Sequence, residues 1–392
     1  MSRLSKLSYQ KLKLHEVEGD RMLLEKQVLH NRLRCLFIDS NERDKVYVSL
    51  HIGSGYGDRI IAKNGDMDWV GSGTTNILLN IRKNQMKAKR PDLNFQSIIT
   101  MDTATLFVEV PVLEVEEITE IMLASLQWED IEEEASKRAF LENLDHVSFR
   151  AMMEIQAYAF PNRLFSVSLI EQDLEEVQFE DVLTLQQAFF HPDNSVLVIC
   201  GDMNKIKVKD KIEKQQMPYE KPKFPAKHVY KRAAGLVDQE INQQANTSYF
   251  IGSLAFRSER IGFSLEEEHV FLQIIGEVIF KKDFQVEVNQ DHASIIYQTS
   301  PKTRYKQALL ATIWSKNKFE QAKAKVYERY RYVKDNDAGM YSFIYGQFAV
   351  KDLDLSQLLL EEEILGFDRF REYIDCVQNT MAETKIHYSN GG

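Results

Sequence analysis

The first half of the chain opens on stretches whose hydrophobic pattern is typical of β-strands. Residues 45–52 alternate between polar and apolar side chains, and this period of two predicts a strand with one buried face. Apolar composition predicts further strands at Leu33–Asp39, Phe95–Thr100, Thr105–Val112 and Ser195–Asp202. Helical spacing predicts helices at about Glu114–Gln127, Ile131–Leu144 and Val147–Phe160, the last of which ends before Pro161.

The second half repeats this order of elements. Thr247–Phe256 alternates in the same way as residues 45–52, and Ser264 and Glu267 form a capping box before a helix at about Leu265–Phe280. His292–Ser300 follows as a strand, and further helices are predicted at about Lys316–Asp335, Tyr341–Phe348, Ser356–Leu365 and Asp368–Thr380. The repetition predicts an internal duplication of α+β units of ~190 residues.

A change of composition separates the two halves. Residues 204–232 contain three of the eight prolines and ten basic against three acidic residues. The lysines have no interleaved aromatic pattern, so a solvated connector is favoured over a phosphate-binding patch. We therefore divide the chain into an N-terminal α+β half at 1–212, a linker at 213–235 and a C-terminal α+β half at 236–392.

Bulk composition narrows the class of protein. The 392 residues are too many for one ordinary domain, and a net charge of −10 argues against nucleic acid or an anionic membrane as a partner. Three distant cysteines (Cys35, Cys200 and Cys376) suit a reducing compartment. The N-terminus lacks the apolar core of a signal peptide, and no apolar run approaches ~20 residues, so we expect a cytoplasmic protein.

The stretch Gly71–Asn80 has the composition of a helix start. Glycines and possible N-caps precede apolar residues, so a helix is predicted to begin here. Asn76 and Asn80 lie four positions apart and point the same way, with Leu79 beside them. Other helices use this spacing to present two metal ligands and a base, but these side chains are two amides and a hydrocarbon.

Other motifs have simpler explanations than catalysis. GSGYG at Gly53–Gly57 lacks the spacing of a nucleotide loop, so a backbone turn is the better interpretation. Glu266 and His269 form an ExxH pair, but a bridged metal site needs a second one. The sequence contains no HxxxH, HxxEH or CxxC, and the residues alone identify no catalytic site.

Several stretches together resemble the insulinase-like zinc metallopeptidases, the family of pitrilysin and the mitochondrial processing peptidase. LHNRLRCLFID and VSLHIGSGYGD are similar to the family's opening strands, and AYAFPNRLF…FFHPDNSVLVICGDMN is similar to its Y-H-P-x-N turn and V-L-V-x-x-G-D strand. LEEEHVFLQIIGEVIF and DFQVEVNQDHASIIYQTS resemble segments of the family's second half. The resemblance implies an α+β fold of two homologous halves, each a mostly antiparallel sheet packed with helices.

The resemblance also implies a degenerate metal site. Asn76 and Asn80 stand where the two zinc-binding histidines of the family's HxxEH helix would be, and Leu79 stands at the general-base glutamate. The third ligand position maps to Asn143, or to Glu142 if the alignment shifts by one residue. Amides are poor zinc ligands and leucine cannot accept a proton, so the resemblance implies no zinc, no other cofactor and no catalysis.

Only some of the family's peptide-binding residues have counterparts in this sequence. The strand after the degenerate helix, Gln96–Thr100 (Gln96, Ser97, Ile98, Ile99 and Thr100), would be the sheet edge to which a peptide adds. The family's substrate-gripping arginine falls at Asn289. Its tyrosine falls at Tyr297 if one residue is inserted, and otherwise at Ile296.

Within the family, heteromeric members pair a metal-bearing subunit with one that has lost the metal, and this sequence is similar to the latter. Such subunits resemble the smaller, inactive member of the peptidase pair that matures subtilosin-type bacteriocins. The expected function is a non-catalytic subunit of a heterodimeric peptidase that completes a chamber and helps bind a peptide. Two alternatives stay open: a stand-alone peptide-binding or assembly protein on the same fold, and an enzyme with an unrecognised site, using Cys200 or His191.

Overall fold

The computed structural model describes residues 24–29, 31–40, 44–56, 60–63, 66–70, 73–126, 146–160, 177–203, 205–214, 236–257, 262–289, 292–298, 300–354 and 365–390. Two of the predicted helices, at 131–144 and 356–365, lie outside these residues almost entirely, as does most of the predicted linker.

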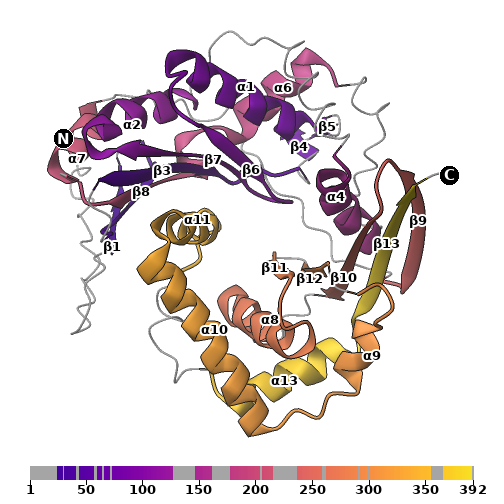
Figure 1. Ribbon diagram of the computed structural model, residues 1–392. Helices are drawn as coiled ribbons and strands as arrows, with labels where there is room; N and C mark the ends of the chain where they lie inside the picture. Colours follow the sequence, from indigo (N-terminus) through magenta and orange to yellow (C-terminus); the bar gives the residue numbers. More distant parts are fainter. Residues whose placement is uncertain are drawn as a thin grey trace.

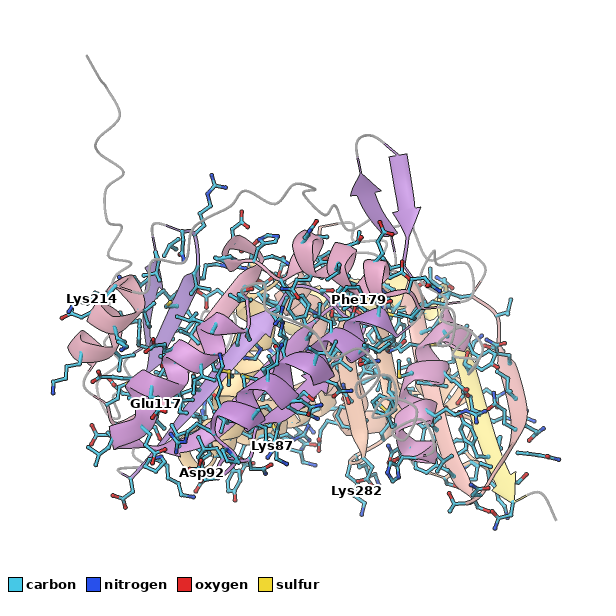
Figure 2. The ribbon with its side chains drawn as sticks, turned by 90° about the horizontal axis from the view of Figure 1, so that it is seen from above. Lys87, Asp92, Glu117, Phe179, Lys214 and Lys282 are labelled. Atoms are coloured by element: carbon cyan, nitrogen blue, oxygen red, sulfur yellow. The ribbon has the colours of Figure 1, made fainter. Side chains whose placement is uncertain are left out.

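The first half is built on a six-stranded sheet in the order β1-β2-β8-β3-β7-β6. Only β2 and β8 pair in parallel, and the other neighbours are antiparallel. The strands are β1 (Leu24–Val28), β2 (Arg34–Ile38), β3 (Lys45–Ile52), β6 (Gln96–Ile99), β7 (Ala104–Pro111) and β8 (Ser195–Gly201). A separate hairpin of β4 (Ile60–Lys63) and β5 (Asp66–Trp69) stands clear of the rest of the ribbon in Figure 2.

The second half is built on a five-stranded sheet in the order β11-β12-β10-β13-β9. Its strands are β9 (Gln239–Ala245), β10 (Tyr249–Arg257), β11 (Phe284–Val288), β12 (His292–Tyr297) and β13 (Ala382–Asn390). Again one pair, β13 with β9, is parallel and the rest are antiparallel. The order β9-β13-β10-β12-β11 matches β2-β8-β3-β7-β6 strand for strand, which confirms the predicted fold of two similar α+β halves.

Helices lie on both sides of these sheets (Figure 1). The first half contributes α1 (Thr74–Lys89), α2 (Val115–Ala124), α4 (Val147–Ala159), α6 (Phe179–Phe189) and α7 (Lys205–Lys214). Short 3-10 turns lie at η1 (Val112–Glu114) and η2 (Pro192–Asn194). The second half contributes α8 (Leu265–Ile279), α9 (Tyr305–Leu310), α10 (Lys316–Asn336), α11 (Ala338–Ala349) and α13 (Phe367–Gln378).

The two halves exchange one helix each. Helix α11 of the second half packs on β3 and β8 of the first sheet, and α4 of the first half packs on the matching strands β10 and β13 of the second sheet. Glycines allow α11 to approach closely: a Cβ on Gly339 would lie 2.7 Å from Cε1 of Tyr47, and one on Gly346 would overlap the ring of His51. Each sheet therefore completes its core with a helix from the other half.

The C-terminal end of α11 is fixed to the first half by charged groups. A guanidinium nitrogen of Arg34 donates a hydrogen bond to the carbonyl of Ala349 at 2.8 Å and also pairs with Asp352. The last carbonyls of a helix have no partner within it, so this arginine satisfies one of them from a neighbouring strand. Lys26 pairs with Asp354 a few residues further on.

Candidate functional site

Helix α1 forms where the sequence predicted it and buries the three candidate positions. Gly73 adopts a left-handed φ of 83° directly before Thr74, a conformation that glycine accepts without a Cβ clash. Asn76, Leu79 and Asn80 are 4%, 2% and 8% exposed. The side-chain amide of Asn76 lies 4.0 Å from the Sδ atom of Met153 on α4, a weak donor–acceptor contact.

The donor set on α1 does not fit a zinc ion. Structural and catalytic zinc sites use thiolate, imidazole or carboxylate ligands, and neither Asn76 nor Asn80 supplies one. Leu79 has no group that could take a proton from a bound water. Among the described residues, His, Cys, Asp and Glu side chains form no cluster of three that could hold a metal. Asn143 and Glu142, the predicted third position, lie outside the described residues.

Strand β6 lies at the edge of the first sheet, beside α1 and β7. At the end of β6, the N–H of Thr100 donates to the carbonyl of Thr103 at 2.8 Å, so these two residues form a hydrogen-bonded pair. The last residue of β6, Ile99, lies opposite Ala104 of β7, and Ser97 lies opposite Leu106. Antiparallel ladders alternate between hydrogen-bonded and non-hydrogen-bonded pairs. The backbone groups of Ser97 and Ile99 therefore point away from β7, towards the position that an added strand would take.

The GSGYG segment supports the end of this strand. The N–H of Tyr56 donates to the carbonyl of Thr100 at 3.0 Å. A Cβ on Gly55 would overlap the backbone of Met101 and Asp102, and one on Gly53 would lie 2.6 Å from Oδ1 of Asn194. The glycines thus allow close packing of the β6–β7 turn and the η2 turn, which agrees with the interpretation of GSGYG as a structural turn.

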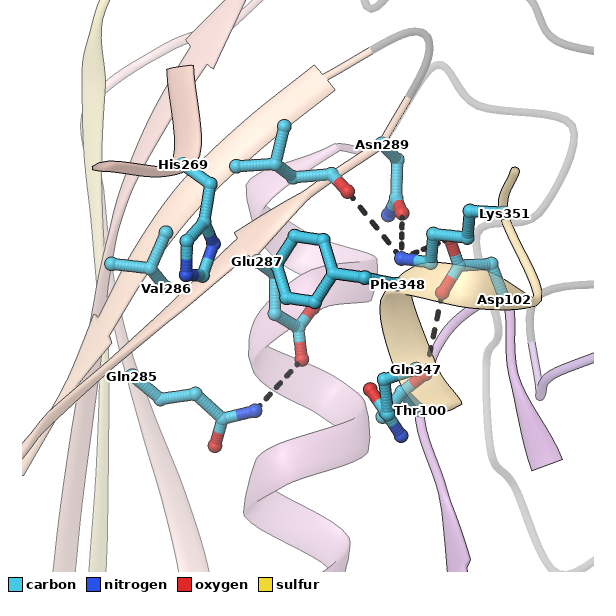
Figure 3. Close-up of a pocket in the computed structure, with 11 residues that line it drawn as sticks. Thr100, Asp102, His269, Gln285, Val286, Glu287, Asn289, Gln347, Phe348 and Lys351 are labelled. Carbon is cyan, nitrogen blue, oxygen red and sulfur yellow. Dashed lines mark hydrogen bonds and ion pairs between the residues drawn. The ribbon is translucent and has the colours of Figure 1, made fainter. Parts of the chain in front are cut away.

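A small pocket, open to solvent, lies between this turn and the second half (Figure 3). Thr100 and Asp102 line it from the first half, and β11, α8 and the end of α11 line it from the second. Lys351 joins the two sides: its ammonium lies 2.8 Å from Asp102 and 3.0 Å from Oδ1 of Asn289, and it donates to the carbonyl of Val288 at 3.4 Å.

Sequence reasoning did not find most of this pocket. Asp102, Glu287 and Lys351 come from three distant segments and belong to no local motif. The side chain of Gln156 on α4 donates to Glu287 at 2.6 Å, so the exchanged helix also holds a pocket residue. These segments meet because the turn after β6 packs against the second half, and no local sequence pattern indicates that contact.

The two positions predicted to grip a substrate differ in their surroundings. Asn289 lines the pocket, where its amide contacts Lys351 and lies 3.2 Å from Nε2 of His292. Tyr297 belongs to the core: it is 1% exposed, it stacks on Phe280, and its hydroxyl donates to Glu383 at 2.6 Å. Tyr297 is therefore not among the residues that line the pocket. Ile296, the other alignment, is buried as well.

The remaining candidate groups have structural partners. Nε2 of His269 lies 2.7 Å from the hydroxyl of Tyr330, and burial lowers the pKa of His269 to about 3. Glu266 accepts a hydrogen bond from the N–H of Asp354 at 3.3 Å, so the ExxH pair serves two separate contacts. His191 lies 2.5 Å from Asp193 in the turn before β8, and Cys200 is buried within that strand.

Comparison with known proteins identifies the class of fold. No protein-family model and no curated protein sequence matches the chain. Among solved structures, a protein described as an M16-like peptidase from Alicyclobacillus acidocaldarius is similar over 95% of this chain and 99% of its own, with a TM-score of 0.76 and 14% identity. The chain therefore has the fold of the M16, or insulinase-like, peptidases, as the sequence resemblance implied.

Two further neighbours carry other descriptions. A peptidase M16 inactive domain from Pseudomonas fluorescens matches 93% of this chain and 97% of its own, with a TM-score of 0.66 and 11% identity. A chain of complex III2 from Candida albicans matches 92% of this chain and 95% of its own, with a TM-score of 0.65 and 12% identity. Among the described residues, no helix is both long and apolar enough to cross a bilayer.

Proposed function

We propose that this protein is the non-catalytic subunit of a heterodimeric insulinase-like peptidase. One observation carries the proposal: the buried helix α1, to which the sequence resemblance assigns the zinc ligands, presents Asn76, Leu79 and Asn80 instead. The metal and the general base would come from a homologous subunit that has both. The M16 fold and the neighbour described as an inactive domain support this assignment.

The second part of the proposal is that β6 binds the peptide. Its free edge offers the backbone groups of Ser97 and Ile99, and main-chain pairing of this kind depends on no catalytic group. Gln96, Ile98 and Thr100 would alternate with them along the strand, and Asn289 would face the peptide from the pocket beyond Thr100. The expected substrate is a precursor peptide, for example the precursor of a bacteriocin.

Mixing the chain with a metal-bearing partner should yield peptide hydrolysis that neither subunit shows alone. Within that mixture, Ser97→Pro should lower kcat/KM about three- to tenfold, because proline removes one outward N–H and thus about one hydrogen bond. Ser97→Ala is the matched control, since it keeps the N–H and should match the wild type.

The two parts of the proposal can fail separately. Hydrolysis that does not change on mixing contradicts the heterodimer. Hydrolysis that rises on mixing but responds equally to Ser97→Pro and Ser97→Ala contradicts the role of β6. Peptide binding without any gain of hydrolysis would favour a stand-alone peptide-binding protein.

A further inference from the structure

The two sheets have four outer edges, and they differ in how they are protected. Strand β1 has five residues, two of them charged: Glu25 pairs with Lys209, and Lys26 with Asp354. Strand β6 has four residues, and at β11 the ammonium of Lys351 occupies the outward carbonyl of Val288. Short length, charge and covering groups limit how much of a sheet edge can pair.

Strand β9 is the longest of the four edge strands. Its seven residues, QEINQQA, contain no proline, no lysine and a single charged side chain, Glu240. In the parts of residues 236–390 that the structure describes, β9 pairs with β13 on one side and ends the sheet on the other. Figures 1 and 2 both place it at the lateral limit of the molecule. It is the longest of the four edge strands and carries one charged side chain, whereas β6 carries none but has only four residues.

Contacts with the exchanged helix hold β9 in place. Gln239 donates to the carbonyl of Tyr158 on α4, and Gln243 donates to the hydroxyl of the same tyrosine at 3.1 Å. Arg150 donates to Oε1 of Gln243 at 3.0 Å, and Glu240 lies 3.1 Å from His387 on β13. A strand fixed in this way loses little conformational freedom when it pairs.

The first sheet shows that the equivalent edge can pair with a further strand. The counterpart of β9 in the first half is β2. Strand β1 covers the outer side of β2 in an antiparallel register, in which Leu24 pairs with Ile38 and Val28 pairs with Arg34. The described part of the second half has no counterpart of β1. Among the residues that the structure describes, none occupies the position beside β9, which has the geometry for one more antiparallel strand.

We propose that β9 of a second copy of this chain occupies that position, so that two molecules join their second sheets into one across a two-fold axis at Asn242. A two-fold interface requires a surface that complements itself. In this register Gln239 opposes Ala245, Glu240 opposes Gln244 and Ile241 opposes Gln243 of the second copy. In this register no residue of β9 lies opposite a residue of the same charge.

The charge pattern of β9 supports this register over a partner of strong charge. The two copies of Glu240 would lie four residues apart along the ladder, about 13 Å, which exceeds the screening length at physiological salt. Val237, just before β9, is 57% exposed. The pairing would place it beside Thr247 of the second copy, where part of its apolar surface would be covered.

This interface is separate from the proposed peptide site. Strand β9 ends the second sheet on the side opposite β11, whereas β6 and the pocket lie towards β11. Pairing through β9 would therefore leave the peptide edge and the pocket open. The proposal is independent of the heterodimer, and each copy could still bind a catalytic partner.

Light scattering on the intact chain tests the proposal. The wild type should show twice the 45.6 kDa mass of one chain and dissociate on dilution. Asn242→Lys should weaken the dimer about tenfold or more, because it places two ammonium groups opposite each other at the axis. Mixing Asn242→Lys with Asn242→Asp should restore the dimer as a hetero-pair, since opposite charges then meet.

Gln321→Lys, on the exposed face of α10, is the matched control with the same change of charge, and it should leave the dimer intact. Circular dichroism of each variant confirms that it is folded. A wild type that stays monomeric, or a dimer equally stable with lysine at 242, overturns the proposal. Gain of hydrolysis with the catalytic partner should be the same for Asn242→Lys as for the wild type, which keeps the two tests apart.

Discussion

At the scale of single residues, two buried histidines stay neutral inside the fold. His51 lies with Nε2 2.9 Å from Ser49 Oγ and Nδ1 3.1 Å from Thr105 Oγ1, and burial lowers its pKa to about 3. Burial lowers the pKa of His269 to about 3 as well, and that of His191 in the same direction. In the unfolded chain each would titrate near pH 6.5.

These shifts predict a loss of stability in mild acid. Below pH 6.5 the unfolded chain binds protons that the folded chain does not, so the free energy of unfolding should fall as pH decreases. The slope should be about 1.4 kcal/mol per pH unit for each such histidine down to about pH 5. Urea unfolding at pH 7.5, 6.5, 5.5 and 5.0 measures it, and His269→Gln should remove one histidine's share. An unfolding free energy that is flat over this range would contradict the burial.

A single glycine sets the distance between α11 and the first sheet. In Gly346→Ala, the added Cβ would overlap the ring of His51, which is held from both sides by hydroxyl groups. Overpacking of this kind should lower the free energy of unfolding by about 1–3 kcal/mol. Gly366→Ala is the matched control, because its Cβ would meet nothing within 4 Å. Equal stability of the two variants in urea would show that α11 packs differently.

At the scale of elements, strands with a clear alternation or apolar composition were predictable from sequence. The hydrophobic pattern predicts a strand at 45–52, which is β3 in the structure. The predicted ends of β2, β6, β7 and β8 lie within two residues of the observed ends. Strands β9 and β13 were missed because QEINQQA and AETKIHYSN are largely polar, and both depend on pairing with distant strands. The β4–β5 hairpin, α6 and α9 were also not predicted.

The exchange of α4 and α11 could not be read from the sequence, because the apolar residues of a helix do not show which sheet the helix covers. It makes a prediction about folding. Residues 1–214 and 236–392 expressed separately should each be unstable, since each sheet would expose the face that the other half's helix covers. Coexpressed, the two pieces should co-elute as one folded species. Gel filtration measures this, and two separately folded, monomeric pieces would contradict the exchange.

At the scale of the whole molecule, the candidate site joins predictable and unpredictable parts. The positions on α1 and the edge strand β6 came from local spacing and from the resemblance of collinear motifs. The pocket did not, because Asp102, Asn289 and Lys351 meet only when the β6–β7 turn contacts β11 and the end of α11. Tyr297 illustrates the limit of alignment, since its place in the second sheet puts it in the core.

In the proposed heterodimer, the peptide is cleaved at the helix of the metal-bearing subunit and not at α1. The most direct measurement is hydrolysis by the mixed pair when one helix at a time is altered. Replacing the general-base glutamate of the metal-bearing partner should abolish hydrolysis, whereas Asn76→Ala or Asn80→Ala here should leave kcat within about twofold of the wild type. Hydrolysis that survives the change in the partner, or that is lost with these asparagines while the chain stays folded, would contradict the claim that α1 has no part in the chemistry.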